Sequence, residues 1–409
     1  RTGMAFETAL SGLNAASSDL DIVGNNIANS NTAGFKTSRG EFADIFAVSN
    51  LGVAGNAIGQ GVALSNVAQE FGQGQFEFTG STLDMAVNGD GFFQLSENNI
   101  DSYTRAGAFS MDRLGYIVNA SGARLQGFPI NPATGDVSSS TPADIQISTG
   151  VSQPQATTSV TIAANIDASE GAIAGTVTFD PANPSSYNHS TSTTVFDSQG
   201  GSHQLTTYYR KESANTWQTY MYVDNNIVPP GNYTGVAPTD ETYFTLNYDA
   251  NGILSSSIDN GTTTNYTPDP VTGEITAVLD YGAYDFDGVQ NANDPIADLV
   301  LDIDYSNLTQ YGGDFSVNAL SQDGYSTGEF TDLDVDSDGN IFARFSNGQA
   351  TTLSRIAVIT FPSQNNLRQT GDTSWTETFA SGLPIAKQPG NAGAGTIESG
   401  ALEQSNVNL

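Results

Sequence analysis

Cysteine is absent from this chain of 409 residues, and basic residues are few. Without cysteine there is no disulfide, no thiol nucleophile and no thiolate ligand for a metal. Lysine and arginine number 12 against 44 aspartates and glutamates, which gives a formal charge of −32. Binding to phosphates requires a basic surface, so this balance excludes a general nucleic-acid binder and argues against binding to anionic membranes.

Long hydrophobic runs are missing as well. No stretch reaches the roughly 18 apolar residues of a membrane span, so we expect no membrane insertion. Glu7, Asp19 and Asp21 interrupt the N-terminal segment, which therefore does not match a secretory signal peptide. The large negative charge makes copies of the chain repel one another, so any polymer of it should form more readily when salt screens that charge.

The N-terminal segment carries large apolar residues at the spacing of one helix face. The heptad positions are Phe6, Leu10, Leu13, Ala16, Leu20, Val23 and Ile27. This pattern predicts an amphipathic helix over Phe6–Ala28, about 35 Å long at ~1.5 Å per residue, ending at the asparagines and glycine that follow. The pattern alone favours one packed helix of a globular domain, and an assembly helix with partners on other subunits is the alternative.

Short strands separated by turn signals fill most of the chain after Leu83. GFFQL, YIVNA and similar runs are separated by Asn-Gly, Asp-Gly and Leu-Gly steps that are typical of hairpins. Between Thr157 and Leu308, alternating β-branched and aromatic runs favour a sandwich or a flattened barrel. We expect four tyrosines of these runs in the core or on a sheet face: Tyr208, Tyr209, Tyr220 and Tyr222.

Two motifs resemble sites of chemistry but lack the context that the chemistry needs. Gly324–Gly328 matches the nucleophile elbow G-x-S-x-G, yet both histidines precede it and the residues after it alternate like a strand. Asp334, Asp336 and Asp338 match the start of a calcium loop, but Phe345 occupies the position of the required glutamate. We therefore predict no enzyme activity, no catalytic residue and no cofactor.

A second acidic cluster offers oxygen ligands at a spacing slightly closer to that of a calcium site. Its members are Asp285, Asp287, Asn291 and Asp294. Acidic loops of an acidic protein are mostly solvated, so we predict no metal site, and calcium binding by such loops stays open.

Several segments resemble one known family. ANSNTAGFKTSRGEF (Ala28–Phe42) is similar to the N-terminal signature of the bacterial flagellar axial proteins, the rod and hook family. LDMAVNGDGFFQL (Leu83–Leu95), the segment Tyr103–Pro129 and SGALEQSNVNL (Ser399–Leu409) continue the resemblance. The middle of the chain is less similar, although Thr193–Tyr209 also resembles the hook member. Rod members are shorter and lack a large central insert, so the resemblance favours a hook subunit.

The resemblance implies a domain order in which a second β domain is inserted into the first. The expected segments are an assembly helix (1–34), an extended arm (35–80), a first β domain in two pieces (81–150 and 309–368), an inserted outer β domain (151–308) and a C-terminal arm (369–409). In the family a second heptad helix pairs with the first. We expect that this partner helix is absent from the present chain, because the sequence stops after its lead-in.

What the resemblance implies for function is structural. The subunit is expected to leave the cell through the flagellar type III export apparatus and to polymerise into a flexible helical tube. This tube acts as a universal joint outside the cell, passing torque from rod to filament. The implied partners are other copies of the chain, the rod, the hook cap, the hook–filament junction proteins and the export apparatus.

The resemblance also assigns candidate site residues. The inner seam between subunits is expected at Phe6, Leu10, Leu13, Leu20, Val23 and Ile27. The signature residues expected to shape the joint after the helix are Asn29, Asn31, Thr32, Gly34, Phe35 and Lys36. Two alternatives stay open: a distal rod or hook–filament junction protein, and a secreted β-sandwich module that binds calcium or carbohydrate.

Overall fold

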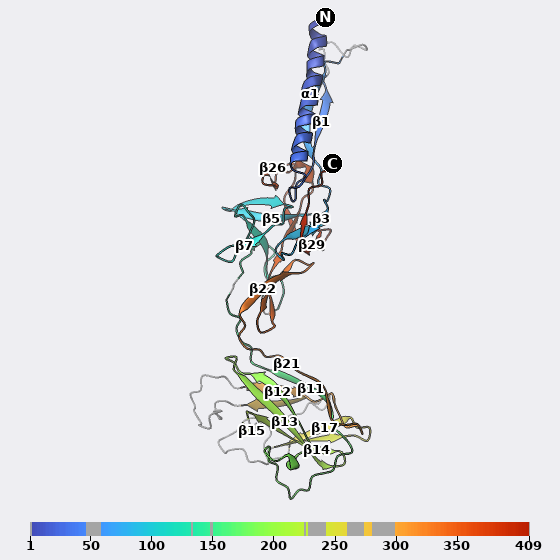
Figure 1. The fold of residues 1–409 in the computed structure, drawn as a ribbon, viewed down its shortest axis with the longest axis vertical. Helices are drawn as coiled ribbons and strands as arrows, with labels where there is room; N and C mark the ends of the chain where they lie inside the picture. The colour runs from blue at the N-terminus through green and yellow to red at the C-terminus, as the bar shows by residue number, and fades with distance from the viewer. Residues whose placement is uncertain are drawn as a thin grey trace. The chain divides into compact units, whose positions relative to one another are not determined.

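The computed structural model describes residues 2–45, 59–131, 134–147, 150–224, 226–227, 243–259, 274–279 and 299–408 (Figure 1). The chain forms two compact units. Unit 1 consists of Arg1–Gly150 and Phe330–Leu409, and unit 2 is the segment Val151–Glu329 between them. Blue and red segments lie together in unit 1, because it contains both ends of the chain (Figure 1). The predicted fold class, mainly β with an N-terminal helix, is confirmed.

Unit 1 begins with a long helix that contacts a β-hairpin. Helix α1 spans Thr2–Ala28, which is about 40 Å at ~1.5 Å per residue. Strands β1 (Ser38–Asp44) and β2 (Val62–Gln69) pair antiparallel and lie against α1 (Figure 1). Among the described helices, none combines the length and the apolar character that a membrane crossing requires.

The main sheet of unit 1 draws strands from both halves of the unit, in the order β22-β23-β24-β9-β5-β6-β27-β26. Its first half contributes β5 (Phe92–Glu97), β6 (Ile100–Thr104), β7 (Ser110–Met111), β8 (Ile117–Val118), β9 (Arg124–Pro129) and β10 (Ala143–Asp144). Its second half contributes β22 (Phe330–Val335), β23 (Asn340–Phe345), β24 (Ala350–Ile356), β25 (Val358–Thr360), β26 (Arg368–Gly371), β27 (Ser374–Thr376) and β28 (Ile385–Lys387). A short 3-10 helix, η2, spans Gln364–Asn366.

Two further strand pairs tie the C-terminal segment of the chain to the first half of unit 1. Strand β29 (Thr396–Ser399) pairs with β4 (Met85–Asn88), and β30 (Ala401–Glu403) pairs with β3 (Phe76–Phe78). These pairings join residues more than three hundred positions apart, so unit 1 is complete only when both halves of the chain are present.

The core of unit 1 lies on both faces of β5. Successive side chains of a strand point to opposite faces, so neighbouring residues enter different clusters. Phe92 is fully buried with Phe361 and Trp375, whereas Phe93 is buried in a second cluster that includes Ile356. The continuous apolar run GFFQL is therefore a strand that is covered on both faces.

The arms predicted at 35–80 and 369–409 are more ordered than the sequence indicates. The structure places β1, β2 and β3 in the first segment, and β27 to β30 together with part of β26 in the second. Six of these eight strands are only three or four residues long, which is too short for alternation to be recognised in the sequence. The partners of β3, β29 and β30 also lie more than three hundred residues away along the chain, so no local pattern reveals those pairings.

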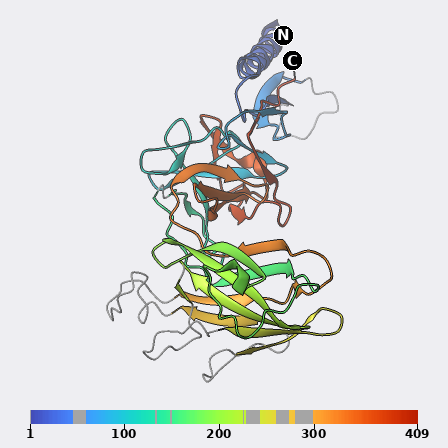
Figure 2. The same ribbon diagram turned by 60° about the horizontal axis from the view of Figure 1, so that its bottom comes forward.

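Unit 2 consists of two facing sheets. One has the order β18-β19-β11-β20 with β21 beside β11, and the other has the order β12-β13-β14-β16-β17 with β15 beside β14 (Figure 2). The first sheet contains β11 (Ser159–Asn165), β18 (Glu274–Leu279), β19 (Leu299–Asp304), β20 (Leu308–Thr309) and β21 (Ser316–Gln322). The second contains β12 (His189–Phe196), β13 (Ser202–Ser213), β14 (Thr216–Val223), β15 (Asn226–Ile227), β16 (Phe244–Tyr248) and β17 (Leu254–Asp259), preceded by the 3-10 helix η1 (Pro184–Ser186).

Side chains from both sheets of unit 2 form one buried cluster. Val160 and Ile303 come from the first sheet, and Leu205 and Trp217 from the second. A shared core between two sheets is the arrangement of a β-sandwich, the first of the two architectures expected. Tyr209 lies in this core, and the other three tyrosines line an aromatic cluster around Phe179.

The predicted end of the insert at residue 308 needs correction. Strands β20 and β21 both pair with β11, and Tyr325 forms a bridge with Gln155. Unit 2 therefore continues to Glu329, and the chain returns to unit 1 only at β22. The sequence shows strands on both sides of residue 308, but strand patterns do not reveal which sheet a strand joins.

Because unit 2 is one continuous segment with its own core, a core mutation there should leave unit 1 unchanged. Leu301 is fully buried in that core, and Leu301→Ala should lower the free energy of unfolding of unit 2 by about 2–5 kcal/mol through lost contacts and a cavity. Trp217 reports on unit 2 and Trp375 on unit 1. Urea unfolding followed by fluorescence, in chains that each retain one tryptophan, measures both transitions.

Ile253→Ala is the control for that experiment, because Ile253 belongs to unit 2 but is half exposed. We expect it to change the stability of unit 2 by about 0.5 kcal/mol or less. An equal shift of the Trp375 transition in Leu301→Ala would contradict two independent cores.

Candidate assembly site

The predicted seam residues form an exposed apolar stripe along α1. Their exposed fractions are Phe6 70%, Leu10 44%, Leu13 68%, Leu20 72%, Val23 44% and Ile27 52%. An amphipathic helix ordinarily turns its apolar stripe toward the core of its own domain. Here the stripe, which we call the seam, faces away from the rest of the described chain.

A different face of α1 contacts the hairpin. The less exposed residues of this face are Ser11, Ala15, Ser18, Ile22 and Asn26, spaced four or three residues apart. At one end the backbone N–H of Val62 donates a hydrogen bond to Ser11 Oγ at 3.3 Å. At the other end Asn26 Oδ1 accepts from the N–H of Ser38 at 2.9 Å, and Asn26 Nδ2 donates to the Ser38 carbonyl at 2.8 Å. The hairpin thus lies on a face of mostly small and polar side chains, of which Ile22 is the one large apolar member.

Close approach between helix and hairpin depends on glycine. A Cβ atom at Gly61 would lie 2.1 Å from Ser11 Oγ, and one at Gly40 would lie 3.2 Å from Ile22 Cδ1. Because the hairpin uses the small-residue face of the helix, the seam is left for other partners. The geometry therefore fits the assembly helix better than the packed helix of an ordinary domain.

The signature residues after α1 form a compact turn. The N–H of Asn29 donates to the Asn25 carbonyl at 3.1 Å, and Thr32 Oγ1 donates to Asn29 Oδ1 at 3.2 Å. Asn31 is exposed in this turn, and Phe35 is buried at its end. Gly34 has a φ of +72°, and a Cβ there would lie 2.4 Å from the backbone N of Ala106, so only glycine fits without strain.

A buried ion cluster lies directly after this turn. Lys36 Nζ is 2.6 Å from Glu403 Oε1, and Arg105 Nη1 is 3.2 Å from Glu403 Oε2. The three side chains are at most 2% exposed. The backbone N–H of Gly74 donates a further hydrogen bond to Glu403 Oε1 at 2.8 Å. One carboxylate therefore joins the segment after α1, the C-terminal segment and the residue that follows β6 in the main sheet of unit 1. We call this sheet, with its connecting segments, the β body.

The electrostatics of this cluster depend on the carboxylate. Burial lowers the pKa of Lys36 below its ordinary value, and the charge of Glu403 opposes that change. Burial lowers the pKa of Arg105 in the same way, again against Glu403. Two cations share one anion. Backbone carbonyls accept further hydrogen bonds from both cations: Gly72 accepts from Lys36 at 2.8 Å, and Gly89 accepts from Arg105 at 2.8 Å.

Asn406 forms a second set of hydrogen bonds beside the ion cluster. Its Oδ1 accepts from the N–H and the hydroxyl of Thr37, at 2.7 and 2.8 Å. Its Nδ2 donates to the carbonyls of Glu70 and Gly72, at 2.7 and 3.0 Å. In addition, the N–H of Gly34 donates to the Glu403 carbonyl at 2.7 Å. The last described residues of the chain thus fix the segment that leaves the helix.

The sequence singled out Lys36 but did not reveal Arg105 and Glu403, the charged side chains beside it, or Asn406, which bonds Thr37. All three lie inside segments that carry the family resemblance, and that was the available signal. Glu403 is 367 residues from Lys36, so no spacing rule connects them.

The motifs that resemble catalytic or metal sites serve local structure. Ser326 lies between β21 and β22, so a strand rather than a helix follows the G-x-S-x-G motif. Asp336 Oδ1 accepts from the N–H of Asn340 at 2.8 Å and closes the β22–β23 hairpin. Asp334 forms an ion pair with Arg344. These carboxylates bond protein groups at a turn.

Within the described residues, no group of three or more histidines, aspartates or glutamates is arranged to hold a metal ion. The cluster of Asp285, Asp287, Asn291 and Asp294 lies outside the described residues.

Three family models match the chain. A model described as "Flagella basal body rod protein" matches residues 6–36, which contain α1 and the turn after it. A model described as "Flagellar hook protein FlgE/F/G D1 domain" matches residues 86–165. A model described as "Flagellar basal body protein FlaE D2 domain" matches residues 165–325, most of unit 2.

Curated relatives match along nearly the whole chain. The flagellar hook protein FlgE of Escherichia coli is 33% identical over 99% of this chain and 91% of its own length. FlgE of Treponema pallidum is 30% identical over 98% of this chain and 91% of its own length. The solved structure of Helicobacter pylori flagellar hook protein FlgE2 matches with a TM-score of 0.51 and 16% identity, over 80% of this chain and all of that one, which supports the fold.

Removal of the shared carboxylate should strongly destabilise unit 1. Glu403→Gln leaves two buried cations with a neutral amide, which should lower the free energy of unfolding by about 3–5 kcal/mol. Urea unfolding of a Trp217→Phe chain, in which Trp375 alone reports on unit 1, measures the change. Glu77→Gln is the matched control, because Glu77 is exposed and bonds Gln404, the neighbour of Glu403.

We expect Glu77→Gln to stay within about 0.5 kcal/mol of the unmodified chain. If both glutamine variants unfolded at the same urea concentration, the carboxylate of Glu403 would not be what holds the segments together.

Proposed function

We propose how this chain, which belongs to the flagellar hook protein family and is a structural subunit of the hook, joins its neighbours. The seam of α1 packs against helices of other copies, and repetition of that contact builds the helical tube. The observation that carries the proposal is the exposed heptad stripe on a helix whose other face is already held by the hairpin.

The energetics favour burial of the seam in a polymer. Full burial of one large apolar side chain contributes roughly 1.5–3 kcal/mol, and the six seam residues are between 44% and 72% exposed. Association costs translational and rotational freedom, side-chain freedom and desolvation of polar groups. A helix with such a stripe is also marginal alone in water, so contact with other helices stabilises both its fold and the assembly.

The turn and the ion cluster form the joint between the seam and the β body. We assign the signature residues to this joint: Asn29, Asn31, Thr32, Gly34, Phe35 and Lys36. A joint that is fixed by buried ionic and hydrogen-bonding contacts transmits force from the helix to unit 1. Unit 1 and the inserted unit 2 then supply weaker contacts that slide when the tube bends, and high charge keeps these contacts weak at low salt.

The role is structural throughout, with no enzymatic activity. The further partners that we propose are the rod, the hook cap, the hook–filament junction proteins and the export apparatus. The segment matched by the FlaE D2 model spans residues 165–325, and this large insert favours the hook subunit over a rod or junction protein.

Leu13→Asp should block tube formation and leave both units folded. Leu13 is 68% exposed, so the substitution removes an apolar contact only when another subunit covers it, and a buried carboxylate there would be costly. Electron microscopy of hooks from cells that express the variant measures assembly. Urea unfolding of the isolated chain should change by about 0.5 kcal/mol or less.

Asn14→Asp is the matched control, since it adds the same charge at the adjacent exposed position. We expect normal tubes from it. Tubes of normal length from Leu13→Asp would contradict the assignment of the seam, and loss of its cooperative β unfolding would show that Leu13 supports the fold instead.

A further inference from the structure

A loop of unit 1 exposes two large apolar side chains outside the seam. Loop 377–384 connects β27 and β28, and in it Phe379 is 106% exposed and Leu383 is 80% exposed. Single exposed leucines are common on protein surfaces, but a fully exposed phenylalanine and an exposed leucine in the same short loop make that loop a candidate contact surface.

The backbone around these side chains is tightly held. Ser381 is fully buried, and its Oγ accepts from the N–H of Thr378 at 2.9 Å. Thr378 Oγ1 donates to the Asn366 carbonyl at 2.7 Å, and the N–H of Ser363 donates to the Ser381 carbonyl at 3.2 Å. The loop therefore presents Phe379 from a defined position, which lowers the entropy cost of docking.

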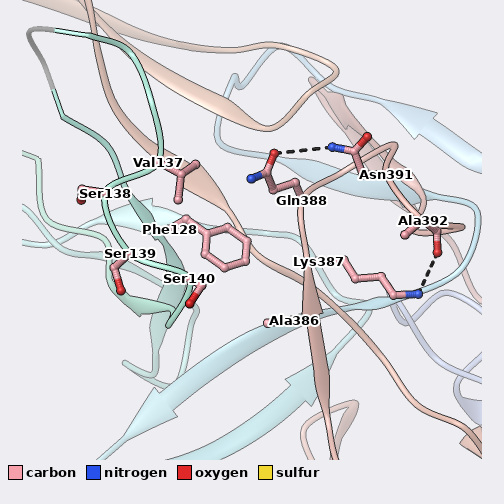
Figure 3. A pocket seen from close by; sticks show the side chains of 10 residues that line it. All are labelled: Phe128, Val137, Ser138, Ser139, Ser140, Ala386, Lys387, Gln388, Asn391 and Ala392. Carbon is pink, nitrogen blue, oxygen red and sulfur yellow. Dashed lines mark hydrogen bonds between the residues drawn. The ribbon is translucent and has the colours of Figure 1, made fainter.

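The same unit contains a recess of about 530 Å³. Figure 3 shows the Phe128 ring between the segment that carries Val137 and Ser140 and the strand that carries Lys387. Phe128, Val137 and Ala386 pack together as its apolar floor. Serine hydroxyls and the amides of Gln388 and Asn391 form its rim (Figure 3). An apolar floor with a polar rim suits an aromatic or aliphatic side chain from another molecule.

The charge pattern indicates which molecule docks there. The chain has a net charge of −32, yet the segment from Thr378 to Ile397 contains no aspartate or glutamate and only one lysine. This segment carries both the exposed loop and one wall of the recess. Two copies of an acidic chain repel one another, so a contact between copies is most favourable where acidic residues are absent.

We propose that Phe379 and Leu383 of one subunit dock in the recess of a neighbouring copy. Phe379 is exposed on its own chain, so its own recess does not cover it. A loop on one copy and a recess on the next form a heterologous contact, the class of contact that generates an open helical polymer when the rotation between copies does not close a ring. The proposal rests on the proposed function, since it takes the neighbouring copy from the tube.

The absence of native cysteine makes a direct test possible. Cells express two single-cysteine chains together, Ala380→Cys and Ser140→Cys, so that a link between the two sites can form only between subunits. Ala380 is exposed beside Phe379, and Ser140 lines the recess. Isolated hooks are treated with a short bis-maleimide, and we expect roughly tenfold more covalent dimer than in the control pair, because held thiols react faster.

The control pair is Ala120→Cys with Ser140→Cys, since Ala120 is an exposed alanine in another turn of unit 1. Adding Phe379→Ser to the Ala380→Cys chain should return the dimer yield to the control value. Adding Leu114→Ser, at a position that is 67% exposed in the turn between β7 and β8, should not.

The outcomes separate this proposal from the proposed function. Hooks that form normally but give no dimer above the control overturn the docking contact and leave the seam intact. A link from Ala380→Cys to a different protein also overturns it, because the occupant is then not a copy. If the unmodified chain formed no tubes in these cells, the proposed function itself would fail, and the docking contact with it.

Discussion

The carboxylate of Glu403 is the group on which the arrangement of unit 1 depends. It binds Lys36, which follows the helix, and Arg105, which belongs to the β body, in a region from which water is excluded. A buried ion pair contributes little net stability compared with apolar packing, but the loss of one partner is costly. Such a cluster acts mainly on specificity, because a shift in the register of the terminal segments would separate the Glu403 carboxylate from Lys36 and Arg105. The close backbone approach at Gly34 and the hydrogen bonds of Asn406 also favour this one arrangement of the terminal segments.

The seam and Phe379 lie on elements that polar contacts attach to the rest of unit 1. Helix α1 is fixed to the hairpin through Ser11 and Asn26, and the seam points elsewhere. Loop 377–384 is fixed through Ser381, and Phe379 points outward. In both cases polar contacts position the backbone and leave the apolar side chains uncovered. This is the reverse of an ordinary domain, and it is what a subunit needs when its largest apolar contacts form with other chains.

Much of this could be predicted from the sequence, and the part that could not has a physical reason. The heptad spacing of Phe6 to Ile27 predicts the helix, and turn chemistry predicts hairpins such as the one that Asp336 closes. Local patterns extend over about ten residues, so they give no information on Glu403, which is 367 residues from Lys36. They also failed at residue 308, because β20 and β21 have ordinary strand patterns and only their pairing with β11 assigns them to unit 2.

The division of unit 1 into two pieces has a consequence for the order of folding. Its key contact closes a loop of 367 residues, whereas unit 2 is continuous and joins Ser152 to Gly328, 176 residues apart, by its own hydrogen bonds. Folding of unit 2 first would remove that stretch from the loop. The saving in closure free energy is only about 0.6 kcal/mol per halving of loop length, so the effect on stability is small. The kinetic effect is larger, since a shorter search between the two pieces speeds the formation of non-local strand pairs. Folding of unit 2 first would therefore shorten the search that brings the two halves of unit 1 together.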